Sequence, residues 1–390
     1  MGREKVFSDG CSRGVLYISN ALLYGFTGLY YCFIQLYLYN ETPHSSAYIG
    51  ILLSIPQAVA IFAPLFWGVC ADKARYKKTV LLIIVAGATL FYSAVPWNDN
   101  FWWLCFAMGG TMFFLSALGS LLDVISMETA NEAKIRYGPM RLMGMLGYGF
   151  VSFGLSFLIA DNLHVVFKVC SVMGVLCCIC VGIMPNVKGH AHAKKMHFAP
   201  LLKGTELLAL IGILATAQFA YGYYLNFFPS YLTHELAAPT WLWGTNVLIT
   251  TLSEAPFYLC FDMIFARFGM KKILPVIIVA TVVRYLLLAV FTQFAGILII
   301  GLLTGFLSAS LLYSVNYYVN QSITPSLRAS AQTLVYAVGL GVPRMLSGLL
   351  GGVMTENLGT NYSLVVCAAV ASGGLLLYLL FFLRKGKRLF

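Results

Sequence analysis

Long apolar runs, each ended by a short polar or charged break, fill the sequence from end to end. A helix needs about 20 apolar residues to cross the hydrocarbon core of a bilayer, and each run comes close to that length or exceeds it. We therefore predict twelve membrane-spanning helices, with little chain left for a soluble domain. The predicted spans lie near residues 14–39, 48–70, 79–97, 102–127, 140–160, 164–184, 206–232, 241–265, 273–292, 295–320, 329–353 and 361–383.

The composition indicates the same class of protein. Of the 390 residues, 60% are hydrophobic and 10% are charged, and the mean hydropathy is +0.83. Soluble domains carry about 25% charged residues, so this chain has too few charges to cover a water-facing surface. The same figures exclude a disordered chain and a secreted disulfide scaffold. The predicted fold class is an all-α membrane protein.

The positions of the basic residues predict the orientation in the membrane. Of the 25 lysines and arginines, 21 lie near the two ends of the chain or in alternate loops, and the other short loops (40–47, 98–101, 161–163, 233–240, 293–294 and 354–360) contain none. The positive-inside rule places the basic side, with both termini, in the cytoplasm. The net charge of +11 then reflects topology and contact with anionic lipids, not nucleic-acid binding. We expect a multi-pass protein of the plasma membrane, the inner membrane of a bacterium.

The sequence repeats at a constant offset of 194 residues. The matches are Tyr30, Phe33, Tyr37 and Leu38 with Tyr224, Phe227, Tyr231 and Leu232; Gly50 with Gly244; and Lys73, Lys77 and Lys78 with Arg267, Lys271 and Lys272. Two six-helix halves related by a parallel repeat form a known transporter architecture, with the substrate site between the halves. We predict an N-terminal six-helix bundle at 1–184, a cytoplasmic linker at 185–205 and a C-terminal six-helix bundle at 206–390.

The loop after the second span carries a characteristic spacing. Gly68 is followed four residues later by Asp72 and then by a basic cluster that begins at Lys73. This loop resembles the signature loop of the major facilitator superfamily, and the equivalent loop of the second half keeps a glycine between basic residues but lacks the acid. The resemblance implies a cytoplasmic gate in which the glycine allows helices to approach closely. The implied gating residues are Gly68, Asp72, Lys73, Arg267 and Gly269.

A narrower resemblance lies in the ionisable residues inside the spans. Asp123, the stretch from Tyr137 to Gly144 that contains Arg141, Glu254 and Arg284 together resemble the lactose permease group and the phenylpropionate-permease-like proton symporters. The resemblance implies that Asp123 and Arg141 hold substrate, and that Tyr148 stacks its ring on it. The sugar permease's tenth-span histidine and acid correspond to Thr304 and Leu307 here, so coupling through those two groups is not expected.

These intramembrane charges can be paired by their distance from the cytoplasmic turns. Each charge inside a span costs about 2.5–3.5 kcal/mol. Asp123 and Arg141 lie nine residues either side of position 132, and Glu254 and Arg284 lie 15 residues either side of Gly269. Residues equally far from one turn lie at the same height on two antiparallel helices, so each pair can meet. The alternative for each pair is a structural ion bridge between packed helices.

Glu254 is the preferred proton-responsive group, because a carboxylate deep in the membrane favours its neutral form and a substrate or Arg284 can reverse that preference. Asp123 is the second candidate for proton coupling. Arg344 is a further intramembrane charge and a possible contact for an anionic substrate group. Glu254 and Arg284 are also candidates for substrate binding. The remaining candidates are Tyr24, Gln218 and Asn316.

The predicted function is secondary active transport: proton-coupled uptake of a small organic solute, such as a sugar, a nucleoside or an aromatic acid, by alternating access. A drug or metabolite efflux antiporter of the same superfamily is the first alternative, and a membrane-embedded enzyme or sensor is the second. The expected partners are the solute, a proton and membrane lipids, and the protein is taken to be a monomer. No enzymatic activity and no cofactor are expected. No metal is expected either, because the linker residues His190, His192 and His197 are interpreted as part of a solvated linker.

Overall fold

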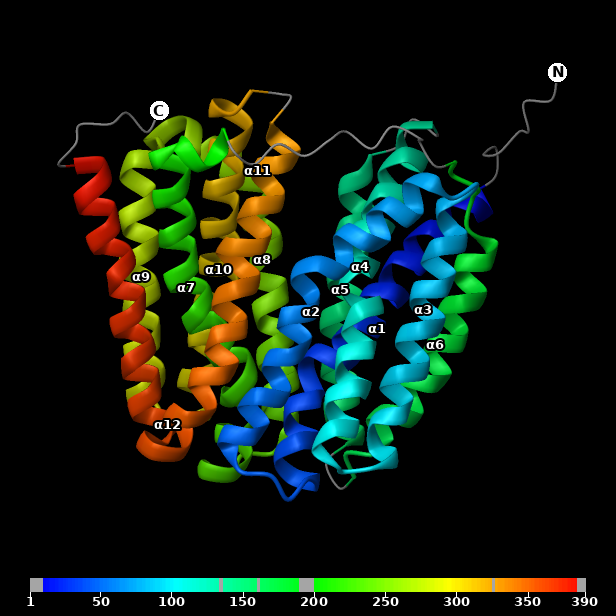
Figure 1. The fold of residues 1–390 in the computed structure, drawn as a ribbon, viewed down its shortest axis with the longest axis horizontal. Coiled ribbons are helices and arrows are strands. Elements are labelled where there is room, and N and C mark those ends of the chain that lie inside the picture. The colour runs from blue at the N-terminus through cyan, green and yellow to red at the C-terminus, as the bar shows by residue number, and fades with distance from the viewer. Residues whose placement is uncertain (1–9, 133–135, 160–161, 189–199, 325–326, 384–390) are drawn as a thin grey trace. The chain divides into compact units, whose positions relative to one another are not determined.

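A computed structural model describes residues 10–132, 136–159, 162–188, 200–324 and 327–383, apart from the side chains of residues 10–13, 203, 257–259, 262, 329 and 383. The linker histidines His190, His192 and His197 lie outside the described residues. Every regular element in the described ranges is helical (Figure 1). The chain divides into two compact units, which are described separately below.

Unit 1 comprises residues 1–42 and 62–193. In it α1 packs on α5 and α6, and α3 packs on α4 and α6. Its helices are α1 (Gly10–Glu41), the second part of α2 (Ser46–Lys73), α3 (Lys77–Ala94) with the turn η1 (Val95–Trp97), α4 (Phe101–Glu132), α5 (Tyr137–Leu158) and α6 (Val165–Ile183).

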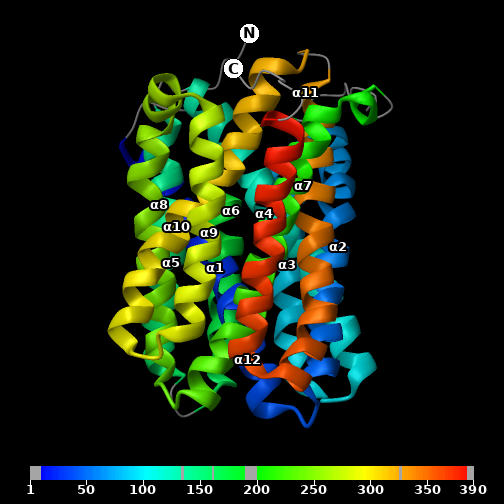
Figure 2. The same cartoon turned by 90° about the vertical axis from the view of Figure 1, so that its left-hand side faces the viewer.

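Unit 2 comprises residues 43–61 and 194–390. Here α12 packs on α7 and α9, and α10 packs on α8 (Figure 2). Its elements are the first part of α2, η2 (Leu201–Lys203), α7 (Thr205–Ser230), η3 (Tyr231–Glu235), α8 (Thr240–Phe268), α9 (Met270–Val290), α10 (Phe294–Ser322), α11 (Arg328–Leu334), η4 (Val335–Gly341), α12 (Val342–Tyr378) and η5 (Leu379–Leu383).

Ten helical stretches of the described chain are long and apolar enough to cross a membrane. The last of them, Ser330–Phe382, contains two helices joined at Gly359, where a φ of 77° interrupts the helical backbone. The 29-residue helix α8 is not among the ten, but it has ample length to span. Its middle carries the polar residues Thr250, Thr251, Ser253 and Glu254, which lower its hydropathy. The second helix within Ser330–Phe382 and the helix α8 bring the number of spans in the described chain to twelve, so the twelve predicted spans are confirmed.

The internal repeat corresponds to equivalent packing in the two units. The eight matched aromatic and leucine side chains of α1 and of α7 with η3 are each at most 3% exposed. At the same offset of 194, Gly28 faces the hydroxyl of Ser152 on α5, and Gly222 faces the hydroxyl of Ser347 on α12. Sequence positions that match therefore meet equivalent partner helices.

The first part of α2 lies directly against α12 within unit 2. A Cβ on Gly50 would come within 2.5 Å of the Gly348 carbonyl oxygen and 2.9 Å of the Gly352 Cα. Ser54 donates a hydrogen bond to the Met345 carbonyl at 3.0 Å. Glycines on both sides let the two backbones touch, which explains why residues 43–61 group with unit 2. The predicted boundaries at 184 and 206 stay a prediction.

Candidate functional site

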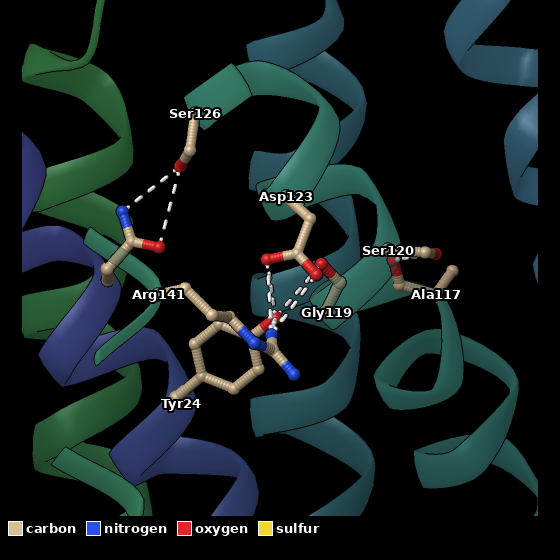
Figure 3. Close-up of polar contacts among 8 residues, drawn as sticks. Tyr24, Ala117, Gly119, Ser120, Asp123, Ser126 and Arg141 are labelled. Carbon is tan, nitrogen blue, oxygen red and sulfur yellow. Dashed lines mark hydrogen bonds and ion pairs between the residues drawn. The ribbon is translucent and has the colours of Figure 1, made fainter. Parts of the chain in front are cut away.

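Three side chains from three helices of unit 1 meet at one point. Tyr24 on α1 donates a hydrogen bond to Oδ1 of Asp123 on α4 at 2.7 Å. Arg141 on α5 pairs with the same carboxylate, its Nη1 lying 3.1 Å from Oδ2, and also donates to the Tyr24 hydroxyl. Figure 3 shows the carboxylate and the guanidinium converging on that hydroxyl. The predicted Asp123–Arg141 contact is therefore present, with Tyr24 as its third member.

The surroundings of this cluster fix Tyr24 and leave the ion pair accessible. The Arg141 guanidinium lies 4.5 Å from the centre of the Tyr24 ring, and a Cβ on Gly144 would come within 2.4 Å of that ring. The side chains of Arg141 and Asp123 are 42% and 30% exposed. A pair held only for helix packing is normally buried, so this exposure favours a site that a solute can reach.

Tyr148 lies two turns beyond Arg141 on α5, as the spacing predicts. Its hydroxyl accepts a hydrogen bond from the Cys32 thiol of α1 at 3.5 Å, and its ring lies near Gly28. The side chain is half-buried against α1. Asn20, one turn before Tyr24, is fully buried and donates to Ser126 of α4 at 3.0 Å, so it ties α1 to α4.

Removing the charge of Asp123 tests what this cluster does. We expect Asp123→Asn to abolish transport, because the neutral amide removes the negative charge that pairs with the Arg141 guanidinium. We expect the exchange Asp123→Arg with Arg141→Asp to stay inactive, since it moves the carboxylate from α4 to α5. Uptake in proteoliposomes, normalised to reconstituted protein, is the measurement. Restored uptake in the exchange variant would show that the pair is only a structural bridge.

Unit 2 contains a small cavity among α7, α9 and α10. Its volume is about 20 Å³, enough for a water-sized group. Arg284, only 2% exposed, lines it, and the Nε and Nη2 of this guanidinium have no hydrogen-bond partner among the described residues. The other lining residues are Ala217, Gln218, Tyr221, Thr281, Tyr285, Thr304, Leu307, Ser308 and Leu311. A buried cation with unused donors at a cavity is a candidate site for binding a polar group.

Glu254 and Arg284 are brought into one region but do not meet directly. Among the described residues the two form no ion pair. Instead, Glu254 of α8 accepts a hydrogen bond from Ser308 of α10 at 3.4 Å, and Ser308 lines the cavity that Arg284 also lines. The Arg284 guanidinium lies 4.4 Å from the ring centre of Tyr224 and 4.7 Å from that of Tyr285. The expected direct pairing of Glu254 with Arg284 is therefore absent, because cation–π contacts hold the guanidinium.

Gln218 and Arg344 form a second polar contact in unit 2. The Nε of Arg344 donates to the Gln218 Oε1 at 2.9 Å, and the guanidinium carbon lies 5.3 Å from the centre of the Tyr221 ring. Gln218 is 3% exposed and lines the cavity. Asn316 does not join this group: it lies eight residues beyond Ser308 on α10, and its Oδ1 has no partner among the described residues.

The predicted gating residues lie at helix ends. Asp72 is half-buried and Lys73 is exposed at the end of α2, and Arg267 is exposed at the end of α8. Gly269 joins α8 to α9 with a φ of 72°, a conformation that favours glycine. Within unit 1, a Cβ on Gly68 would meet nothing within 4 Å, so the described residues of this unit show no close approach there. The gating role of Gly68 stays a prediction.

Several residues that line the cavity were not among the candidates predicted from the sequence. Thr304 and Ser308 stand one turn apart on α10, and Tyr285 directly follows Arg284. Polar side chains spaced three or four residues apart on an apolar span share a face, and that spacing was the available signal. It did not distinguish these residues from other hydroxyls of the span, because Thr304 and Ser308 also donate to carbonyls of their own helix, as Ser314 does to the Ser310 carbonyl.

The model of the MFS_1 like family matches residues 16–364. The chain belongs to this family. Two similar proteins over nearly full length are an uncharacterized transporter, YwbF, of Bacillus subtilis and the maltose permease of Geobacillus stearothermophilus. Both are 24% identical, the first covering 91% of this chain and 90% of its own, the second 91% of each. The sucrose permease of Escherichia coli is 25% identical over 32% of each chain.

Solved structures support the fold of this family member. The nucleoside transporter NupG, in a point-mutant form, superposes with a TM-score of 0.84 at 18% identity, covering 95% of this chain and 99% of its own. A second NupG structure gives a TM-score of 0.82 at the same identity, covering 96% of this chain and 99% of its own. The MFS_1-like chain therefore has the twelve-helix major facilitator fold predicted from the sequence, built from two six-helix pseudo-repeats. It is a secondary transporter with a small-molecule substrate, and it is a multi-pass membrane protein.

Proposed function

We propose that this MFS_1-like transporter takes up a small organic solute (a sugar, a nucleoside or an aromatic acid) together with protons, by alternating access. Maltose and sucrose permeases are among its relatives, and a nucleoside transporter shares its fold. The observation that carries the proposal is the placement of Glu254 against Ser308, beside the cavity that Arg284 lines. A carboxylate there can exchange its proton in response to a bound solute.

Each unit contains candidate groups for substrate binding. In unit 1, Asp123 and Arg141 offer an accessible ion pair that can exchange its bonds for solute hydroxyls or a carboxylate. In unit 2, Gln218 and Arg284 face one cavity. Asp72 and Lys73 in unit 1, and Arg267 and Gly269 in unit 2, stand at helix ends where a cytoplasmic gate would act. The positive-inside pattern supports cytoplasmic termini in the bacterial inner membrane.

Reconstitution of the purified full-length protein tests the proposal. We expect one class from a panel of glucose, maltose, uridine and benzoate to drive proton uptake into proteoliposomes that enclose a pH-sensitive dye. The same solute should show counterflow, and its net uptake should increase with an inward proton gradient, since protons enter with the solute. Liposomes without protein are the control. Counterflow without any proton movement would leave a transporter but remove proton coupling.

A further inference from the structure

The charges inside unit 2 do not balance. Away from the ends of the membrane spans, this unit carries Arg284 on α9 and Arg344, where η4 continues into α12, against the single described carboxylate of Glu254 on α8. Glu356 of α12 lies beside the break at Gly359. The side chain of Asp262 lies outside the description, and its position is eight residues, about 12 Å along the helix axis, towards the end of α8. Unit 1, by contrast, pairs Arg141 with Asp123. An uncompensated cation in a low-dielectric interior favours the binding of an anion.

Arg344 is the cation with room for such an anion. The Arg344 side chain is half-buried, and its Nε donates a hydrogen bond to Gln218. It forms no ion pair with any described residue. The Nε hydrogen bond leaves the two terminal nitrogens of the guanidinium, and this pair can bind a carboxylate in bidentate fashion. Arg284, which is 2% exposed and packed between tyrosine rings, has space beside it only for a water-sized group.

The internal repeat allows a comparison of Arg344 with unit 1, although Arg344 lies 203 residues after Arg141 and is not its repeat equivalent. Gln218 stands 194 residues after Tyr24, at the same offset that relates Gly222 to Gly28. In unit 1 the α1 residue contacts an arginine of the partner helix α5, and in unit 2 the α7 residue contacts an arginine of the partner helix α12. The first arginine also has a carboxylate from the protein. The second has none among the described residues.

Aromatic rings adjoin the open guanidinium. Arg344 lies over Tyr221, and the Tyr221 ring is stacked against Tyr224 at a centroid distance of 6.2 Å. Tyr221 also lines the cavity together with Gln218. A ring face next to a guanidinium suits a molecule that has an apolar or ring portion attached to its anionic group.

We propose that the transported solute carries a carboxylate, which binds the terminal nitrogens of Arg344 while the body of the solute contacts Tyr221. The inference rests on the proposed transport function and narrows its substrate class from sugars, nucleosides and acids to organic acids. Gln218 orients the Arg344 guanidinium by accepting a hydrogen bond from its Nε. The carboxylate supplies to Arg344 the charge that Asp123 supplies to Arg141.

Matched probes on the purified full-length protein test this assignment. Thermal unfolding is followed with benzoate against benzamide and with glucuronate against glucose, at constant ionic strength set with sodium chloride. We expect the carboxylate of at least one pair to raise the unfolding temperature while its neutral partner does not. The shift should vanish in Arg344→Gln and be reduced in Arg344→Lys, which keeps the charge but loses the two-nitrogen edge. It should persist in Arg328→Gln, a control arginine whose Nε donates to the Ile323 carbonyl at 3.1 Å.

Equal shifts from both members of each pair, including no shift at all, would overturn the inference, as would a shift that survives in Arg344→Gln. A shift produced equally by chloride would also overturn it and indicate an inorganic anion site. Should Arg344→Gln not fold, Arg344→Lys carries the comparison. Counterflow measurements distinguish failure of the proposed carboxylate site from failure of the proposed transport function. Transport of glucose or uridine that is insensitive to Arg344→Lys keeps the transporter and removes the carboxylate, whereas carboxylate binding without counterflow keeps the site and removes the transport assignment.

Discussion

The variant Glu254→Gln is expected to lose substrate-driven proton uptake completely while it keeps solute exchange. A glutamine is the neutral, uncharged counterpart of a protonated glutamate, so a carrier that must bind and release a proton at this position can no longer complete a coupled cycle. Exchange of solute across the membrane needs no change in protonation. Pyranine fluorescence reports proton entry, and counterflow of labelled solute reports exchange, in the same proteoliposomes.

The pH dependence of this variant has a defined sign. In the wild-type protein, solute binding should strengthen as the pH falls, because protonation of Glu254 accompanies occupancy in a symporter. In Glu254→Gln the affinity should no longer change with pH, since the group that takes up the proton is gone. A binding curve that keeps its full pH dependence in the variant would assign coupling elsewhere, with Asp123 the next candidate.

Glu206 offers a matched control for this experiment. It is half-buried in the same unit and, like Glu254, accepts a hydrogen bond from a hydroxyl, that of Tyr318 at 3.0 Å. It lies in the first turn of α7, however, not in the middle of a span. We expect Glu206→Gln to retain proton uptake. Equal loss in both variants would mean that the assay reports stability instead of coupling.

The second large effect is expected at Gly147, where α1 and α5 touch. A Cβ at this position would lie 2.0 Å from the carbonyl oxygen of Ala21 and 2.6 Å from its Cα, so the obstacle is backbone. Gly147→Ala must force the helices apart, and overpacking of this kind costs about 1–3 kcal/mol, or more where no side chain can yield. We expect a clear fall in the unfolding temperature of the purified protein and weaker solute binding, since Tyr24 is one turn from Ala21.

Gly154 provides the control on the same helix. A Cβ there would meet nothing within 4 Å, and alanine is a better helix former than glycine by about 1 kcal/mol. Gly154→Ala should therefore leave the unfolding temperature unchanged or slightly raised. If Gly147→Ala were as stable as Gly154→Ala, the close contact between α1 and α5 would be wrong, and with it the placement of Tyr24 against Arg141.

The membrane explains why so much of the fold could be predicted from the sequence. Lipid cannot hydrogen-bond to the backbone, so each long apolar run becomes a helix wherever it lies in the chain. The break at Gly359 and the turn at Gly269 were placed correctly because charged or glycine-rich segments must leave the hydrocarbon. The observed helices differ from the predicted spans at their ends. For example, α4 continues to Glu132, beyond the predicted end of its apolar run at residue 127.

The pairing of charges was predictable to different extents. Asp123 and Arg141 lie on consecutive helices joined by one short turn, so equal distances from that turn place them at the same height, and they meet. Glu254 and Arg284 satisfy the same arithmetic, yet they do not form an ion pair among the described residues. Height along the membrane follows from residue counting, whereas the rotation of each helix about its axis depends on the packing of all its neighbours.

The sequence alone determined the class of protein, its twelve spans, its repeat and the list of charges that had to be accommodated inside. It could not determine which partners those charges have. The tertiary structure decided that Tyr24 joins Asp123 and Arg141, that Arg284 lies between tyrosine rings, and that Gln218 orients Arg344. The physical reason is that hydropathy is a property of each residue in its solvent, while a contact depends on how neighbouring helices are rotated and how closely small residues such as Gly144 and Gly147 let them approach.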